Sequence, residues 1–229
     1  MFSDTDIKQQ IEERRNNSTK GISIEPFEEK YLTPVGYDFR VGVKGFSWKN
    51  KREIDIEQER RIEIEPNDTV VIETLESVSL SKGVGATIHA MATRAVLYGL
   101  SHISTTIDPG WTGKLLISVH NYRDSSVELR FRDSFCTVCF YKAESESKVP
   151  LGRPVDRDDL WQQLIEISRQ EKKKKERENI SRNILIFSVV AIVLVFGVFI
   201  SLKNPELGSA VAAFIALLSP IVYDKLKIK

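Results

Sequence analysis

Two long stretches without charge near the C-terminus constrain this chain more than any other feature. Residues 184–202 and 207–223 hold no acidic or basic side chain, although charged residues make up 28% of the sequence. Each stretch is close to the roughly 20 residues that a helix needs to cross the core of a bilayer. A buried core helix is the alternative, but two such runs in succession with polar flanks favour a membrane hairpin.

The connection between the two runs sets the topology of this hairpin. Residues 203–206 allow only a tight turn, so the two helices are expected to be antiparallel with both outer ends on one side. Basic residues flank both outer ends: Lys172 to Lys175, Arg177 and Arg182 before the first run, and Lys225, Lys227 and Lys229 after the second. The positive-inside tendency then predicts a multi-pass protein of a bacterial or archaeal cell membrane, with both termini in the cytoplasm. Residues 1–21 are charged and do not resemble a signal peptide.

The remaining charge pattern points to lipid and not to nucleic acid. The net charge is only +1, and the one basic run lies directly before the first apolar stretch. Such a run is typical of a segment that faces anionic lipid, so no direct nucleic-acid binding is expected. Cys136 and Cys139 lie three apart in an expected strand and point to opposite faces, and no paired histidine accompanies them. A zinc site, and any other protein-bound metal, is therefore not expected.

The part of the chain before the membrane runs divides into a β-rich domain and a helical stalk. Ser3 and Asp6 form a capping-box pattern that predicts a short N-terminal helix. From Gly21 onward, brief alternating segments separated by turn residues predict a mainly β barrel or sandwich. These segments are GISIEPF, YDFRVGVKGF, RRIEIEPND, TVVIETLESVSL, GKLLISVHN, SVELRF and FCTVCFYK.

After Pro150 the strand pattern stops and a helix is expected. Leu160, Leu164 and Ile167 recur at helical spacing and predict an amphipathic stalk that continues into the first membrane run, with Trp161 packing on the barrel or on a neighbouring stalk. The expected domains are a β domain (1–150), a linker and stalk (151–183), two transmembrane helices (184–202 and 207–223 within 184–223) and a basic cytoplasmic tail (224–229).

Several ordered motifs of the β domain resemble the dCTP deaminase branch of the dUTPase superfamily. The resemblance covers about residues 2–150, and the helical hairpin lies outside it. The motifs are FSDTDIKQQI, ISIEPF, YDFRVG, TLESVSL, GLSHISTTIDPGWTG and FCTVCFYK.

This resemblance implies a distorted dUTPase-like β-barrel that forms a homotrimer or a higher homo-oligomer, with nucleotide pockets where subunits meet. It places Asp108 near the sugar of the nucleotide, where dUTPases use a carboxylate to orient the attacking water. Independently, Pro109 and Gly110 permit a sharp reversal beside a ligand, and Trp111 offers a flat apolar surface.

Other positions depart from the family pattern and weigh against catalysis. The deaminase glutamate position holds Ser118, which cannot take a proton from water and return it to the leaving ammonia. Arg94 is retained as one phosphate-binding residue, but the second basic position falls on Val96 or Leu97. No residue is assigned as catalytic, and Asp108 would be the catalytic residue only if the chain is active. The expected ligand-binding set is Arg94, Asp108, Gly110, Trp111, Ser118 and Asn121.

Two functions follow from this pattern, with a vestigial scaffold as a third. The favoured interpretation is a membrane effector whose degenerate β domain senses a nucleotide or cyclic nucleotide and controls the hairpin. Its architecture resembles β-domain effectors with two membrane helices in bacterial antiphage nucleotide-signalling systems, which disrupt the inner membrane. The alternative is a membrane-tethered active dUTPase or dCTP deaminase. No cofactor is assigned from the sequence, and Mg²⁺ is expected only if nucleotide phosphates are bound. His120 next to Asn121 could serve as an acid/base group, but a strand histidine is more often structural.

Overall fold

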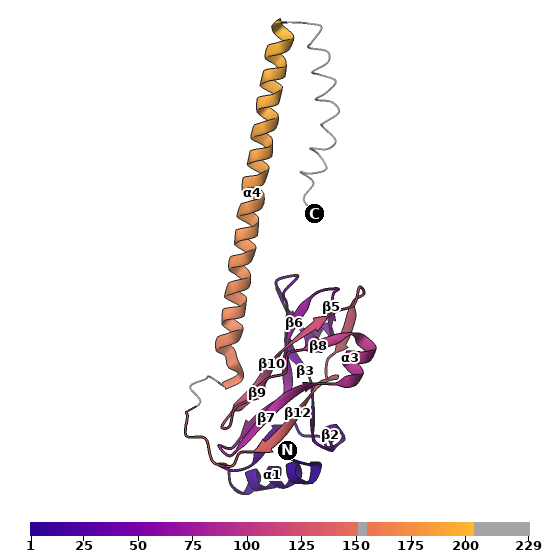
Figure 1. The fold of residues 1–229 in the computed structure, drawn as a ribbon, viewed down its shortest axis with the longest axis vertical. Helices are drawn as coiled ribbons and strands as arrows, with labels where there is room; N and C mark the ends of the chain where they lie inside the picture. Colours follow the sequence, from indigo (N-terminus) through magenta and orange to yellow (C-terminus); the bar gives the residue numbers. More distant parts are fainter. Residues whose placement is uncertain (151–154, 204–229) are drawn as a thin grey trace. The chain divides into compact units, whose positions relative to one another are not determined.

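The computed structural model describes residues 1–150 and 155–203 of the chain. The second predicted transmembrane helix (207–223) and the basic tail (224–229) lie outside the described residues. Contacts divide the chain into one unit, Met1–Ser168, and a second that begins at Arg169. The first unit is mainly β, as predicted (Figure 1).

All strands of the described residues lie in the first unit. They are β1 (Ile22–Glu25), β2 (Leu32–Thr33), β3 (Gly36–Ser47), β4 (Arg52–Asp55), β5 (Arg61–Ile64), β6 (Thr69–Leu80), β7 (Val84–Ala90), β8 (Leu100–His102), β9 (Thr106–Ile107), β10 (Thr112–Asn121), β11 (Val127–Arg130) and β12 (Ser134–Lys142). The helical elements are α1 (Asp4–Asn16), η1 (Glu29–Tyr31), α2 (Ile56–Glu59), α3 (Ala92–Tyr98), η2 (Val155–Arg157) and α4 (Asp158–Lys203).

Ten of the strands form one large sheet. Its main path runs β8-β10-β6-β3-β12-β7-β9, with β1, β2 and β4 paired at its side, and β5 and β11 make a separate hairpin. All of these pairings are antiparallel. The seven segments predicted from alternation each contain a strand of this structure.

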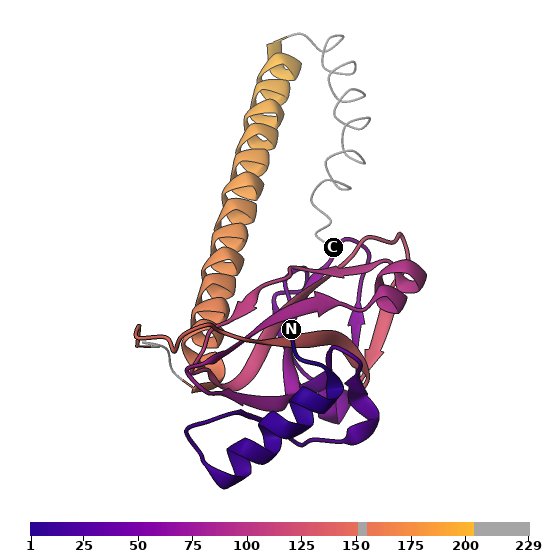
Figure 2. The same ribbon diagram turned by 60° about the horizontal axis from the view of Figure 1, so that its bottom comes forward.

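The N-terminal helix forms as its capping residues predict. The hydroxyl of Ser3 accepts a hydrogen bond from the backbone N–H of Asp6, and the Asp6 carboxylate accepts one from the backbone N–H of Ser3. Ile7 and Ile11 are buried in the same core as the sheet residues. Figure 2 shows α1 lying against the strands. Local capping thus starts the helix, and burial of its apolar face holds it in place.

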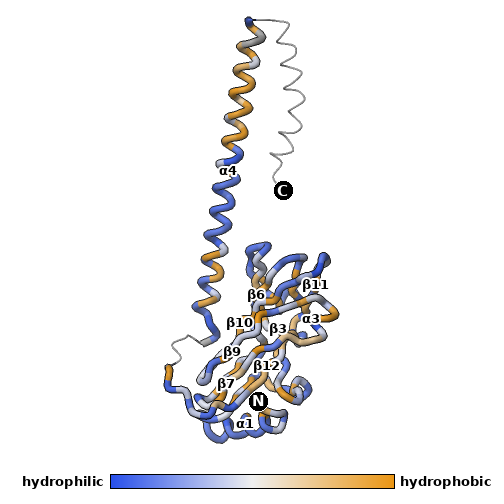
Figure 3. The backbone as a smooth tube through the Cα atoms, in the orientation of Figure 1, coloured by the Kyte–Doolittle hydropathy of each residue, from blue (hydrophilic) through white to orange (hydrophobic). Residues whose placement is uncertain are grey.

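Helix α4 runs without a break from Asp158 to Lys203 and changes character along its length. Figure 3 shows a hydrophilic stretch followed by a hydrophobic one. Within the described residues it is the one helix that is long and apolar enough to cross a membrane, by length and composition. This agrees with the first of the two predicted spans.

The buried stripe at the base of α4 is displaced by one residue from the prediction. Leu160 and Ile167 are 41% and 47% exposed, whereas Trp161 and Ile165 are buried. Trp161 and Ile165 form a cluster with Phe46 of β3 and Val71 of β6, against which Trp48, Leu164 and Leu116 pack. The packing of Trp161 on the barrel, one of its two predicted positions, is confirmed. Leu160 and Ile167 lie on an adjacent apolar stripe of the helix, and only the sheet selects between the two stripes.

Candidate functional site

The turn between β9 and β10 is the local structure around which the candidate site forms. The backbone N–H of Trp111 donates to the carbonyl of Asp108 over 3.1 Å, and that of Gly110 donates to the carbonyl of Ser81 over 3.2 Å. Gly110 adopts a φ of 85°, a conformation that glycine accepts without steric cost. The Asp-Pro-Gly-Trp sequence therefore makes the tight turn that its composition predicts.

A cavity of about 200 Å³ lies beside this turn, and we call it the Trp111 cavity. The indole of Trp111 is 6% exposed, and its Nε1–H donates to the carbonyl of Gly113 over 3.1 Å. The lining residues are Ile88, Thr105, Thr106, Ile107, Trp111, Leu115, Leu116, Arg157 and Leu160. Two of these, Arg157 and Leu160, come from the segment that begins α4. The cavity is thus mostly apolar, with two threonines and one cation at its walls.

Ser118 lies farther along β10 and lines a second cavity of about 270 Å³, which we call the Ser118 cavity. Its lining residues are Thr69, Ser101, His102, Ile103, Ser118, His120 and Tyr122, and none of them is a carboxylate. Ser118 and His120 are two residues apart in β10, so their side chains lie on the same face of the strand. The His120 ring is held by a 2.9 Å contact between its Nδ1 and the hydroxyl of Thr69. The cavity therefore has hydroxyls and two imidazoles among its lining residues.

His102 is the most unusual group in the Ser118 cavity. Both of its ring nitrogens are buried, and neither makes a hydrogen bond within the described part of the chain. Burial lowers the pKa of this imidazole, because the charged form is poorly solvated. A neutral histidine of this kind has one donor and one acceptor to offer a ligand.

Four residues of the predicted ligand-binding set line neither cavity: Asp108 and Gly110 lie at the turn, and Arg94 and Asn121 lie elsewhere. Arg94 on α3 donates from Nε to the carbonyl of Ser134 over 3.0 Å and pairs with Asp133 at 3.4 Å. Asn121 is fully buried: its amide donates to the carbonyls of Ile64, Glu65 and Ser125, and its Oδ1 accepts from the backbone N–H of Arg123. The amide of Asn121 thus stabilises the loop after β10 and has no free hydrogen for a ligand.

The predicted residues therefore separate into distinct groups in one copy of the chain. Asp108, Gly110 and Trp111 lie at the turn, and Ser118 lies in the second cavity. Sequence reasoning did not find His102, Arg157 or Leu160, because each reaches its cavity through contacts between segments far apart in the chain. Tyr122 and Ile103 of the Ser118 cavity are exposed, as are Val96 and Leu97 of α3.

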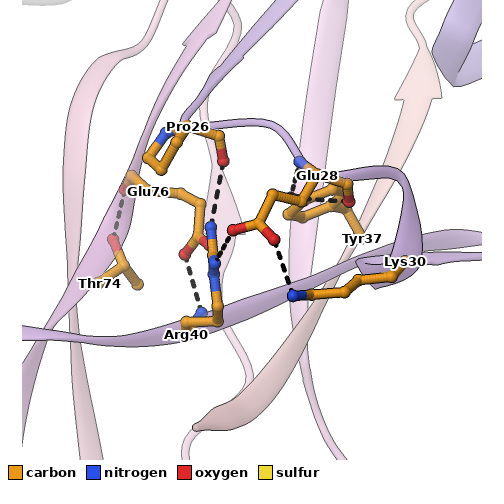
Figure 4. A network of polar contacts seen from close by, with 7 residues as sticks. All are labelled: Pro26, Glu28, Lys30, Tyr37, Arg40, Thr74 and Glu76. Carbon is orange, nitrogen blue, oxygen red and sulfur yellow. Dashed lines mark hydrogen bonds and ion pairs between the residues drawn. The ribbon is translucent and has the colours of Figure 1, made fainter. Parts of the chain in front are cut away.

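A buried polar network fixes the strands beneath the site (Figure 4). The Arg40 guanidinium on β3 donates to the Glu76 carboxylate on β6 over 2.5 Å and also contacts Glu28. Burial alone would lower the pKa of Arg40, but its bonds to the two carboxylates outweigh burial and raise it. The hydroxyl of Thr74 donates to the carbonyl of Glu76 over 2.7 Å and accepts from the backbone N–H of Leu115 over 2.9 Å. The ion pair is thereby joined to the strand that lines the Trp111 cavity.

Metal ligation is not evident in the described ranges 1–150 and 155–203, which hold no group of three or more His, Cys, Asp or Glu side chains placed to bind an ion.

Comparison with known protein families identifies the family of this chain. Residues 1–143 match the family model described as DCD, dCTP deaminase-like. The chain belongs to the dCTP deaminase-like family. It is 37% identical over 131 residues to the dCTP deaminase of Thermococcus sibiricus and 36% identical over 131 residues to that of Pyrococcus furiosus. Each alignment spans 57% of this chain and 82% of the relative. A dUMP-forming dCTP deaminase from Tropheryma whipplei is 24% identical over 171 residues, or 68% of this chain and 84% of the relative.

Solved structures of the same kind resemble the fold at low sequence identity. The 2'-deoxycytidine 5'-triphosphate deaminase from Agrobacterium tumefaciens superposes with a TM-score of 0.49 at 16% identity, covering 61% of this chain and 47% of that one. A mutant dUTPase from phage phi11 of S. aureus gives a TM-score of 0.41 at 13% identity, covering 58% and 97%.

The family match of this dCTP deaminase-like chain ends before two residues that line the Trp111 cavity. The match ends at residue 143, whereas Arg157 and Leu160 in the wall of the Trp111 cavity lie beyond it.

Proposed function

We propose that the dCTP deaminase-like domain binds a pyrimidine nucleotide without deaminating it, and that α4 holds this domain at a membrane. The observation that carries the proposal is the lining of the Ser118 cavity, which contains no carboxylate. Deamination at the pyrimidine C4 needs a group that shuttles a proton between water and leaving ammonia. Ser118 cannot do this unaided, because its hydroxyl needs a neighbouring base to activate it.

Binding is supported by the walls of the two cavities. The Trp111 cavity has the apolar surface that a base or sugar ring needs, and hydroxyl groups at its edge give polar partners. The Ser118 cavity adds imidazole and hydroxyl groups that can bond the polar edge of a pyrimidine. We expect pyrimidine nucleotides or cyclic pyrimidine nucleotides as ligands, with Mg²⁺ entering only on their phosphates.

A homo-oligomer, for which the family resemblance implies a trimer, completes the proposed site. Val96 and Leu97 on α3 are 80% and 67% exposed, and Ile103 at the rim of the Ser118 cavity is 78% exposed. Contiguous exposed apolar side chains of this kind favour a protein interface. Association through this surface would bring Arg94 near a pocket of a neighbouring copy, where the resemblance places phosphate.

Membrane attachment is supported by the composition of α4. Within the described part of the chain, its apolar stretch at residues 184–199 exposes large apolar side chains such as Ile184, Phe187 and Leu194. The basic run at Lys172 to Lys175 lies about two and a half to three helical turns before this stretch, where anionic lipid headgroups would be. With a second span at 207–223, the chain would cross twice and keep both termini in the cytoplasm.

We further propose that nucleotide binding controls the membrane segment, as in an antiviral effector that disrupts the inner membrane. Expression of the full chain is expected to depolarise bacterial cells under some nucleotide conditions, whereas a chain ending at residue 183 is not. Unchanged membrane potential with the full chain, across cyclic and linear pyrimidine nucleotides, would contradict this role.

A second function, a membrane-tethered dCTP deaminase or dUTPase, is favoured by one specific observation. His120 lies on the same face as Ser118 and is oriented by Thr69, so an imidazole is present beside the position of the missing glutamate. Calorimetric titration of the full chain with dCTP and dUTP, followed by analysis of the nucleotides, separates the two functions. The first predicts saturable binding and unchanged nucleotide, and the second predicts product.

A further inference from the structure

The base of α4 lines one cavity of the site and contacts residues next to the other. We define this base as residues 158–168, all within the first unit. Leu116 lines the Trp111 cavity and also packs against the cluster formed with Trp161 and Ile165. Ser118, two residues farther on the same face of β10, pairs across the sheet with Val71, which is a member of that cluster. The residues around Ser118 on two sides are thus in contact with the base of α4.

Polar contacts hold the start of α4 to the same strand. The Asp156 carboxylate accepts from the backbone N–H of Lys114 over 2.6 Å. The Trp161 indole donates to the Glu53 carboxylate over 3.3 Å, and Asp158 lies 4.0 Å from the Lys44 ammonium. The base of α4 is therefore bound at β10, β3 and β4 by both apolar and polar groups.

Neither cavity has the size or charge of a complete nucleotide site while the base of α4 is docked. At about 200 Å³ and about 270 Å³, each is smaller than the roughly 300 to 1,000 Å³ of typical small-molecule sites. The guanidinium of Arg157, the one cation in the walls of the Trp111 cavity, is paired with Asp159 through two nitrogens at 3.0 Å and 3.2 Å. With the base of α4 docked, the Trp111 cavity thus has room for one ring of a nucleotide, and the charge of Arg157 is neutralised by Asp159.

We propose that residues 158–168 act as a latch, and that a pyrimidine nucleotide binds tightly only when this latch is released from β10. This inference rests on the proposed nucleotide-binding function and adds its regulation. Release withdraws Leu160 and Arg157 from the Trp111 cavity and uncovers Leu116, which joins the two cavities along β10. Because α4 is continuous into the apolar stretch, a nucleotide that favours release also changes the constraint on the membrane helix.

The latch and the nucleotide are expected to oppose each other: a weaker latch should give tighter nucleotide binding. The apparent dissociation constant of a ligand equals its intrinsic value divided by the fraction of protein in the binding-competent state. Weakening the latch raises this fraction and must therefore strengthen binding. Trp161→Ala removes the largest side chain of the latch cluster. Ile167→Ala removes an apolar side chain of the same segment that is 47% exposed, and it serves as the matched control.

Titration of the full chain in detergent micelles with dCTP tests this inference. Trp161→Ala is expected to bind dCTP at least about tenfold more tightly than the unaltered chain, and Ile167→Ala with unchanged affinity. Asp156→Ala, which leaves the apolar cluster intact, should give an intermediate increase if Trp161→Ala fails to fold. Saturating dCTP should also speed amide hydrogen exchange in residues 158–168 of the unaltered chain.

Two negative results have different meanings. Equal or weaker dCTP binding by both latch variants, with no change in exchange at residues 158–168, would overturn the latch and leave nucleotide binding in place. Absence of dCTP binding by the unaltered chain and by both variants would overturn the latch together with the proposed function.

Discussion

The carboxylate of Asp156 and the backbone N–H of Lys114 form a 2.6 Å hydrogen bond that ties the segment before α4 to the strand of the candidate site. Lys114 lies three residues after Trp111 and four before Ser118, so this bond acts between the two cavities. Gly113, directly before Lys114, has a φ of 129°, and a Cβ there would lie 2.4 Å from the backbone nitrogen of Asp156. The close approach of the two segments requires glycine at this position.

Gly113→Ala is therefore expected to destabilise the protein by about 1 to 3 kcal/mol, because the methyl group is both strained and in collision with backbone. Thermal unfolding of the purified chain followed by circular dichroism measures this change. Gly83→Ala is the matched control, since a Cβ at Gly83 would meet nothing closer than the Glu146 Cγ at 3.8 Å. An equal loss of stability in both variants would contradict the close contact between Gly113 and Asp156.

The buried Arg40–Glu76 ion pair gives a second prediction. Glu76→Gln leaves the Arg40 guanidinium buried with only the half-exposed Glu28 carboxylate as a charged partner, and we expect a loss of about 3 kcal/mol in unfolding free energy. Chemical denaturation monitored by tryptophan fluorescence gives this value. The control Glu128→Gln breaks an exposed pair with Arg61 and should leave the transition midpoint almost unchanged. A wild-type midpoint for Glu76→Gln would show that the pair contributes little.

The neutral state of His102 predicts a pH dependence of stability. Burial lowers its pKa in the folded chain, whereas the unfolded chain has the ordinary value of about 6.5. Below about pH 6.5 the unfolded state therefore binds more protons, and stability must fall as the pH is lowered. Melting temperatures at pH 7.5, 6.5 and 5.5 should decline less steeply in His102→Phe than in the unaltered chain. The same slope in both proteins would assign the acid sensitivity to other groups.

Restoring a carboxylate tests the interpretation of Ser118. Ser118→Glu places an acid/base group in a cavity that lacks one, and we expect release of ammonia from dCTP at least about 100-fold faster than by the unaltered chain. Ser118→Gln, which has the same shape without the titratable group, should remain inactive. Turnover by the unaltered chain as fast as by Ser118→Glu would favour catalysis by His120 or another group.

The elements that the sequence predicts well are those set by local interactions. The capping of α1 by Ser3 and Asp6 and the turn at Gly110 involve residues within a few positions of each other, and burial alternates along β10 as expected for a strand. Strand β7 was not predicted because Gly85 and Ala86 dilute its alternation, and α3 was not predicted because the segment was interpreted as a phosphate-binding loop.

The candidate site was only partly predictable, because its cavities depend on contacts between distant segments. Ser118 and His120 meet His102 only through the pairing of β10 with β8. Asn121 was expected to bind ligand, yet its amide is bonded to backbone carbonyls, and no sequence pattern reveals which face or loop such an amide serves. Packing of Trp161 rather than of Leu160 and Ile167 likewise depends on the sheet.

The central claim is that this dCTP deaminase-like domain binds a pyrimidine nucleotide and does not convert it. Its most direct test is to equilibrate the full chain in detergent with dCTP and Mg²⁺, recover the protein-bound nucleotide by rapid filtration, and identify it by chromatography. The account predicts stoichiometric recovery of unchanged dCTP. Recovery of dUTP or dUMP formed at an ordinary enzymatic rate, or no retained nucleotide at all, would contradict it.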